Sequence, residues 1–223
     1  MNDDDLADFF DRCPRLYHMA WEGSWPLIER IGLRNTSDLL SQFEVPEEIQ
    51  TQLMSKRRPA SVPIEHPELG SAVVRDQIPL SDADLEACLL DGLTPADWHK
   101  RLNERVFFWT NRDRLVGLLS ARAYRKQAHD VIEVETEPLV KAYRHKIELS
   151  PMNSGCTRPW RHPRGKTTFL PIKDYPYRDR LRRSKKDDAV VELTVLDGVP
   201  NIKDFTVAVN RMQGDEVLEK LFP

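Results

Sequence analysis

Residues 15–33 read RLYHMAWEGSWPLIERIGL, and the fold prediction starts from them. Side chains alternate along a strand, so Leu16, His18 and Ala20 would share one face of a strand that begins here. A histidine inside an apolar strand has two interpretations: it is a core residue with a satisfied hydrogen bond, or it belongs to a functional site. The strand alone does not decide between them.

A short helix is predicted directly after this strand. Ser24 is suited to be its N-cap, and Pro26 is tolerated in the first turn because that position needs no N–H donor. Gly32 readily takes the left-handed conformation that ends a helix. The stretch therefore predicts a strand, a tight loop and a capped helix.

The overall composition is that of an ordinary globular protein. At 223 residues, with 40% hydrophobic and 31% charged residues, the chain suits one folded domain and not a disordered segment. The net charge of −3 gives no general attraction to nucleic acid, so any such attraction must be local. Cys13, Cys88 and Cys156 are too scattered for a disulfide framework, which predicts a reducing, cytoplasmic location. No apolar run is long enough to span a membrane, so no membrane partner is expected.

The remaining pattern predicts an α+β fold with a split, mostly antiparallel sheet, because strands are interrupted by helices early and paired late. A helical insertion is expected at about 34–104, and a basic loop with little regular structure at about 150–186. Within the insertion, residues 73–77 are either a short strand or polar groups presented to a site. Further strands are expected at 105–109, 130–135, 146–149, 189–195 and 205–209.

Glu192 is the first candidate site residue, because it is an acid in an otherwise largely apolar strand. A charge in such a strand is costly unless it is paired or used in chemistry. The alternative is a side chain that faces solvent from a half-exposed strand. The small polar residues of 153–155 predict a tight turn that could border the same cleft.

The strand at 105–109 carries further candidates. Phe107 and Trp109 share a face and are either core residues or a stacking surface for a ligand. Arg105 stands at the entrance of this strand and is a candidate phosphate contact. The histidines lie too far apart in sequence for local metal pairs, so no metal site is predicted.

The basic loop interleaves cationic and aromatic residues. Lysine and arginine bind phosphates, and an aromatic ring can stack on an unpaired base, so the loop is a candidate surface for a nucleic-acid or other acceptor. The alternative is a solvated surface loop. The candidates are Trp160, Arg161, Arg164, Lys166, Arg180, Arg182 and Arg183, and the basic run continues through Lys185 and Lys186.

The strand and helix at 15–33 resemble the opening of the ADP-ribosyltransferase superfamily, in which a His-bearing apolar strand precedes a helix that ends in Gly-Leu. The RNA 2′-phosphotransferases and the bacterial toxins that ADP-ribosylate DNA are similar in pattern. The chain also resembles a bacterial family of unknown function. The shared blocks are LYHMAWEGSWP, VVRDQIPL, RVFFW and VVELTV.

The resemblance implies that three strands of a split sheet bring a His, an aromatic residue and a Glu to one cleft that takes NAD as a substrate. Glu192 would be the catalytic carboxylate that stabilises an oxocarbenium-like ribose. The aromatic position departs from the family pattern, because most relatives carry a Tyr there. The residues expected to hold NAD are His18, Met19, Ala20, Arg105, Phe107 and Trp109.

The function that follows from the resemblance is NAD-dependent ADP-ribosyl transfer to a nucleic acid or a protein. If the chain is a bacterial toxin or a phage-defence effector, an antitoxin is a further expected partner. The alternative is a non-catalytic module on the same fold that binds nucleic acid or a partner protein. The missing Tyr favours this alternative, and the apolar setting of Glu192 opposes it.

Overall fold

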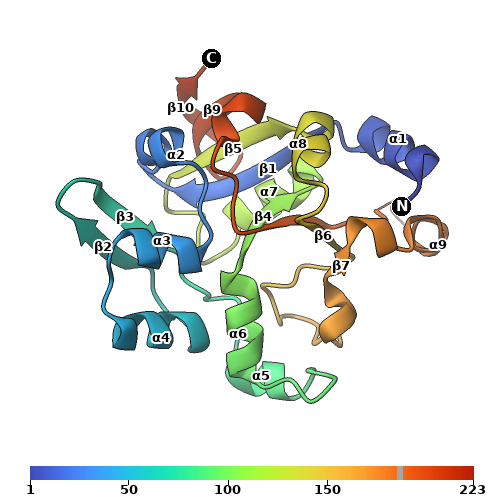
Figure 1. Ribbon diagram of the computed structural model, residues 1–223, viewed down its shortest axis with the longest axis horizontal. Coiled ribbons are helices and arrows are strands. Elements are labelled where there is room, and N and C mark those ends of the chain that lie inside the picture. The colour runs from blue at the N-terminus through green and yellow to red at the C-terminus, as the bar shows by residue number, and fades with distance from the viewer. Residues whose placement is uncertain (185–187) are drawn as a thin grey trace.

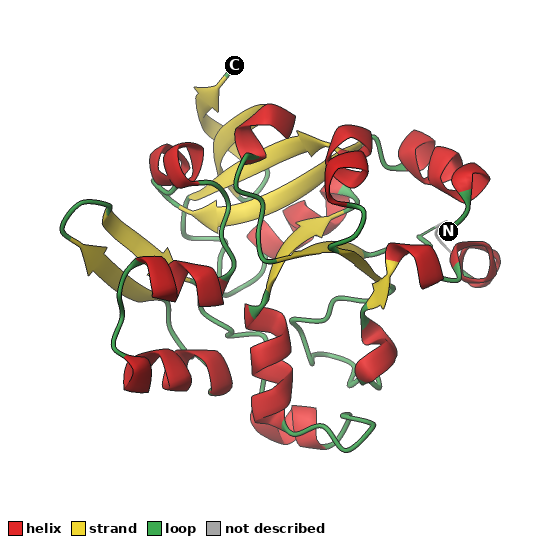
Figure 2. Ribbon diagram, viewed as in Figure 1, coloured by secondary structure: helices red, strands yellow, loops and turns green. Residues whose placement is uncertain are grey.

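The computed structural model describes residues 1–184 and 188–223, and it has the α+β architecture predicted from the sequence (Figures 1 and 2). Lys185 and Lys186, predicted as part of the basic loop, lie outside the described residues. Over these described residues the main sheet has eight strands, and all of its pairings are antiparallel. In sheet order they are β10 (Glu216–Phe222), β9 (Thr206–Gln213), β5 (His129–Glu135), β1 (Arg15–Trp21), β4 (Arg105–Trp109), β8 (Glu192–Leu196), β6 (Ile147–Ser150) and β7 (Leu170–Pro171).

The main sheet is split between β1 and β4. β1 pairs with β5 along its whole length, from Arg15 to Trp21, and β4 pairs with β8 over all of its residues. Among the described residues, by contrast, a single pair, Tyr17 with Trp109, joins β1 to β4. The sheet therefore consists of a first half-sheet (β10, β9, β5, β1) and a second half-sheet (β4, β8, β6, β7).

Helix α2 (Trp25–Ile31) follows β1 as predicted and ends at Gly32, whose φ is 86°. Ser24 occupies the N-cap position, but its side chain makes no capping hydrogen bond. After the helix, Leu33 forms an antiparallel bridge with Val199, in the turn that follows β8. The chain after β1 is thus attached to the second half-sheet.

The segment between α2 and β4 contains helices and a two-stranded sheet. Within the predicted helical insertion, residues 62–74 form a hairpin, which packs with two helices around Leu40, Phe43, Ile64 and Val74. The elements of this segment are α3 (Thr36–Gln42), α4 (Glu47–Ser55), β2 (Val62–His66), β3 (Gly70–Val74), α5 (Asp82–Glu86) and α6 (Pro95–Asn103). In Figure 1 the first four of them lie at the lower left, and α6 and α5 lie below β4.

The remaining helices surround the main sheet. The described part of the stretch expected to have little regular structure, 150–184, contains an α-helix, two short 3-10 helices and the two-residue strand β7. The strand β10 was not predicted. Within the part of the chain that the structure describes, no helix has the length and apolar character needed to cross a membrane. These elements are α1 (Asp3–Arg12), α7 (Arg112–Leu119), α8 (Thr136–Tyr143), η1 (Lys166–Thr168), η2 (Ile172–Asp174), α9 (Tyr177–Arg183) and η3 (Ile202–Phe205).

The largest hydrophobic core lies on one face of both half-sheets. It includes Leu16 and Ile132 from the first half-sheet and Phe108 and Leu193 from the second, all with no exposed surface. Since side chains alternate along a strand, the neighbours of these residues point to the opposite face. The core therefore holds the two half-sheets together from one side.

Candidate functional site

A cavity of about 330 Å³ lies where the sheet splits, and we call it the cleft. Both half-sheets line it, together with α2, the segment after β3, and residues of the 153–155 turn. Among the predicted residues, those that line it are His18, Met19, Ala20, Arg105, Phe107, Trp109 and Glu192. All of these residues line one cavity, but the strand registers place His18 on the sheet face of Leu16 and Phe108, and Trp109 and Glu192 on the opposite face.

His18 bridges the split with its side chain. Its Nδ1 lies 2.8 Å from the carbonyl oxygen of Phe107 in the second half-sheet. A carbonyl can only accept, so Nδ1 carries the proton, and Nε2 of the neutral ring is left as an acceptor. Burial, together with the nearby charge of Arg75, lowers the pKa of His18 to about 4, against the backbone hydrogen bond, which raises it. His18 is therefore neutral at physiological pH and presents an acceptor.

Glu192 is buried at the start of β8, so the alternative of a solvent-facing side chain is wrong. Glu192 is 4% exposed, and its backbone is paired with Trp109 of β4 on one side and with Ser150 of β6 on the other. The backbone N–H of Ser154 lies 3.1 and 3.2 Å from its two carboxylate oxygens. Burial raises the pKa of Glu192 to about 7, although the hydrogen bonds from Ser154 and the charge of Arg164 act in the opposite direction.

Arg164 holds the turn that positions Glu192. The residue is 1% exposed, and its guanidinium donates to the carbonyl oxygens of Ser154 and Cys156, each at 2.9 Å. Trp98 lies under the guanidinium, and its Nε1 is 3.4 Å from the same Ser154 oxygen. Arg164 was predicted to bind an acceptor, but its buried guanidinium is committed to the backbone of this turn.

Phe107 and Trp109 share one face of β4, as predicted, and this face is opposite the main core. Both interpretations of the two rings, core residue and cleft wall, hold in part. Phe107 packs edge-on against Phe169, with ring centroids 6.1 Å apart. Trp109 packs against the small core that includes Leu115 and Val131. Both are half-buried and also line the cleft, so each ring has one side in a core and contributes to the cleft wall.

Arg105 lines the cleft, but its charge is already paired. Its Nη2 lies 2.6 Å from Glu148, its Nε 2.8 Å from the same oxygen, and its guanidinium stacks over Phe169. It also donates to the carbonyl of Arg101. A guanidinium whose donors face these groups is poorly placed to bind a phosphate, so the predicted role of Arg105 is not supported by its contacts.

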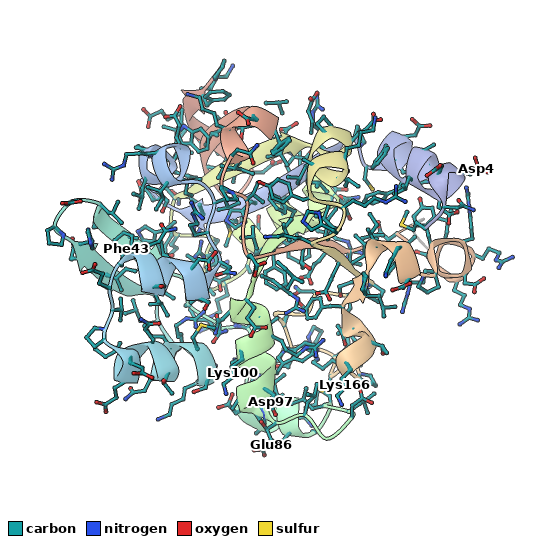
Figure 3. All side chains as sticks on the ribbon, viewed as in Figure 1. Asp4, Phe43, Glu86, Asp97, Lys100 and Lys166 are labelled. Atoms are coloured by element: carbon teal, nitrogen blue, oxygen red, sulfur yellow. The ribbon has the colours of Figure 1, made fainter. Side chains whose placement is uncertain are left out.

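The predicted basic loop is divided between two places. Near its start, Arg158 and Arg161 pair with the buried Asp84 of α5, and Trp160 between them is 71% exposed. Lys166 lies at the same end of the molecule as Lys100 and Asp97 of α6 (Figure 3), and its backbone N–H donates to Asp91.

Helix α9 lies elsewhere, beside α1. There Arg178 pairs with Asp5 at 2.7 Å. On the same helix Arg182 pairs with Asp179, and Arg180 lies over Tyr175. Arg180 and Arg183 also line a second cavity of about 560 Å³. No described residue of 156–184 lines the cleft, so the two basic surfaces lie outside it.

The cleft has further polar residues that the sequence did not single out as site residues. After β3 ends at Val74, the polar residues Arg75, Asp76 and Gln77 line the cleft, so both alternatives for 73–77 apply to parts of it. Tyr124 also lines the cleft and was not predicted as a site residue. Its hydroxyl donates a hydrogen bond of 2.7 Å to Asp76. Within residues 1–184 and 188–223, no cluster of three or more His, Cys, Asp or Glu is arranged to hold a metal ion.

The comparison with known proteins identifies a family without assigning an activity. No curated protein matches the sequence. A family of unknown function, DUF7002, matches residues 14–206. This range includes every strand of the main sheet except β9 and β10, and every residue of the cleft named above. The chain therefore belongs to the DUF7002 family.

Proposed function

We propose that the protein is an NAD-dependent ADP-ribosyltransferase that modifies a nucleic acid or a protein. The observation that carries the proposal is that His18 and Glu192, far apart in sequence, line one cleft at the split between β1 and β4. A cavity of this kind, lined by apolar walls and a few fixed polar groups with shifted pKa values, is the usual form of a ligand site.

The chemistry requires a fixed negative charge. When the bond between nicotinamide and ribose breaks, positive charge develops on the ribose, and a preorganised carboxylate stabilises it. Glu192 suits this role because the Ser154 N–H fixes its carboxylate in a buried site. The acceptor then forms a bond to the ribose C1′ and loses a proton, while nicotinamide leaves.

The other cleft residues would bind NAD. The Nε2 atom of His18 can accept a hydrogen bond from a ribose hydroxyl, since Nδ1 donates to Phe107. The rings of Phe107 and Trp109 form an aromatic wall of the cleft, against which nicotinamide can stack.

The test is release of nicotinamide from NAD in the presence of a mixed nucleic-acid and protein acceptor pool. Glu192→Gln keeps the shape but removes the charge, so we expect its rate to fall roughly a hundredfold or more with a much smaller change in NAD affinity. His18→Ala should weaken NAD binding as well as turnover. The wild-type rate should rise with pH through about 7, because the carboxylate must be ionised.

Glu216→Gln, an exposed position on β10, is the matched control and should be fully active. A fully active Glu192→Gln variant would overturn the site assignment. A wild type that neither binds NAD nor releases nicotinamide would overturn the transferase proposal.

A second candidate is a non-catalytic module that binds nucleic acid. The observation that favours it is Trp160, which is 71% exposed between Arg158 and Arg161. An exposed Trp beside two cations can stack on a base while the cations contact phosphates. Binding of single-stranded nucleic acid that Trp160→Ala abolishes, without any NAD turnover by the wild type, would support this candidate over the first.

A further inference from the structure

We propose that Arg75, in the polar segment that follows β3, binds the diphosphate of a nucleotide held in the cleft. The inference deepens the proposed function and rests on it where the nucleotide is NAD. It assigns the anionic part of the ligand to the insertion between the half-sheets, and not to Arg105 or the basic surfaces.

Arg75 differs from the other arginines that line the cleft. Arg34 and Arg58 donate to backbone carbonyl oxygens, and Arg105 pairs with Glu148. The Nε and Nη1 atoms of Arg75 are buried and have no hydrogen-bond partner among the described residues. Buried donors are almost always satisfied, so a guanidinium in this condition indicates a partner that the chain itself does not provide.

The groups around Arg75 hold its charge without using its donors. The guanidinium carbon lies 5.8 Å from the ring centroid of Trp21 and 5.5 Å from that of Tyr124, both in cation–π range. The carboxylate of Asp76 comes no closer than 4.0 Å, and it accepts hydrogen bonds from Tyr124 and Ser61 instead. The Nε and Nη1 donors therefore stay without a partner among the described residues, in a side chain that is 22% exposed and lines the cleft.

The backbone at Arg75 is fixed in advance. Arg58 Nε donates to the carbonyl oxygen of Arg75 at 2.8 Å, and Arg58 and Gln77 exchange two further hydrogen bonds. Because the backbone is already ordered, binding a ligand here requires the ordering of one side chain. Such preorganisation strengthens binding.

A diphosphate fits both the chemistry and the position. Phosphate oxygens accept two parallel hydrogen bonds from the planar guanidinium, in a geometry that a lysine cannot reproduce. Arg75 is also close enough to His18 that its charge contributes to the low pKa of that ring. In NAD the diphosphate is attached to the nicotinamide ribose, so neighbouring groups of the ligand would meet neighbouring side chains.

The experiment compares ligands with and without phosphate on the wild type and on Arg75→Ala, by calorimetry. We expect the variant to bind NAD, ADP-ribose and inorganic pyrophosphate about tenfold to a hundredfold more weakly, the range for a lost hydrogen bond to a charged group. Binding of nicotinamide riboside, which has no phosphate, should be unchanged. Arg75→Lys should recover part of the affinity, and the exposed Arg122→Ala should behave as wild type.

A thermal melt without ligand separates binding from a structural role. Because the Arg75 side chain donates no hydrogen bond to the described residues, and the backbone bond from Arg58 is kept in the variant, removal of the side chain should not lower the Tm. If Arg75→Ala nevertheless fails to fold, Arg75→Lys provides the same comparison of ligands.

The outcomes distinguish the two proposals. Equal binding of NAD by the wild type and Arg75→Ala would overturn this inference and leave the transferase proposal standing. Arg75-dependent binding of ADP-ribose or pyrophosphate without nicotinamide release would support this inference and overturn the transferase proposal. A wild type that binds none of the phosphate-bearing ligands would overturn both.

Discussion

Glu192 destabilises the fold above neutral pH, although the proposed chemistry requires it. Burial raises its pKa from 4.5 to about 7, so between these values the folded state binds more protons than the unfolded state. Stability contributed at this residue therefore decreases as the pH rises from about 4.5 to 7. At pH 8 the charge is present in both states and is penalised in the folded one.

This titration predicts that the Glu192→Gln substitution stabilises the protein at high pH, although the same substitution removes the proposed activity. We expect the free energy of unfolding at pH 8 to increase by about 1–3 kcal/mol, because the variant has no charge to bury. At pH 5 the difference in stability between the variant and the wild type should be small, since the Glu192 carboxyl of the folded wild type is then largely protonated. Urea unfolding at both pH values measures it, and a loss of stability at pH 8 would contradict the assigned environment.

At this scale the sequence predicted the setting of some residues and not of others. Glu192 stands among Val190, Val191 and Leu193, so its burial follows from its neighbours. Arg164 stands among charged and proline residues, and nothing in that pattern indicates that its guanidinium will donate to the carbonyl oxygens of Ser154 and Cys156, ten and eight residues earlier. For 73–77, which includes Arg75, the sequence left a strand and a site segment open, because the choice depends on contacts between segments.

Among the elements, α2 is fixed by a close approach of two backbones. The α-hydrogen position of Gly32 faces Pro200, so a Cβ there would lie 2.3 Å from the Pro200 carbonyl oxygen. Gly32 also has a φ of 86°, which residues with a side chain rarely adopt. The contact holds the end of α2 against the turn after β8, in the second half-sheet.

Gly32→Ala should therefore be strongly destabilising. We expect a loss of about 2 kcal/mol or more, from backbone strain together with displacement of the turn at Pro200. Gly23→Ala is the control, because Gly23 has a similar φ of 80° but nothing within 4 Å of the added Cβ. Chemical denaturation of both variants gives the comparison, and equal losses would show that the close approach contributes nothing.

Substitutions on helix α9 test whether its basic surface binds nucleic acid. Replacing Arg180, Arg182 and Arg183 with Ala should lower the Tm only slightly, because Arg182 and Arg183 are exposed and the half-buried Arg180 loses one cation–π contact with Tyr175. Affinity for single-stranded nucleic acid should fall, and the salt dependence should become flatter by about 2 in the logarithmic slope if each arginine contacts one phosphate. The exposed Lys126→Ala is the control, and an unchanged slope would exclude α9 from the acceptor surface.

The elements also show where pattern reading fails. The strand at 15–21 and the helix that ends at Gly32 have strong local signals and were predicted correctly. The hairpin β2–β3 was missed because its sequence is rich in proline and charge, and its apolar residues reach a core formed with other segments. β10 was missed because most of its residues are exposed, so no alternation marks it as a strand.

For the whole molecule, buried histidines set the response to acid. The pKa values of His18 and His129 are lowered from 6.5 to about 4, mainly by burial and also by the charge of Arg75. Between those values the unfolded state binds more protons, so their contribution is complete above pH 6.5 and is lost as the pH falls towards 4. Glu192 acts in the opposite direction over part of this range.

The prediction is a loss of stability between pH 6.5 and 4 that is clearest in the Glu192→Gln background. His129 is fully buried and packs edge-on against Tyr124, so Phe is a suitable replacement by shape. In the Glu192→Gln background, His129→Phe should reduce the loss over this range. Urea midpoints at half-unit pH steps measure it, and identical slopes with and without His129 would contradict the buried, neutral state of this ring.

The single pair between Tyr17 and Trp109 has a consequence for ligand size. Continuous pairing fixes neighbouring strands at about 5 Å, which excludes any ligand from between them. Where β1 and β4 separate, the opening of the cleft comes from the separation of the two main chains. It does not depend on small side chains at the lining positions. Substitutions at lining positions such as Leu27, Val73 and Leu118 therefore change which ligands are admitted without closing the opening or altering the strands that form it.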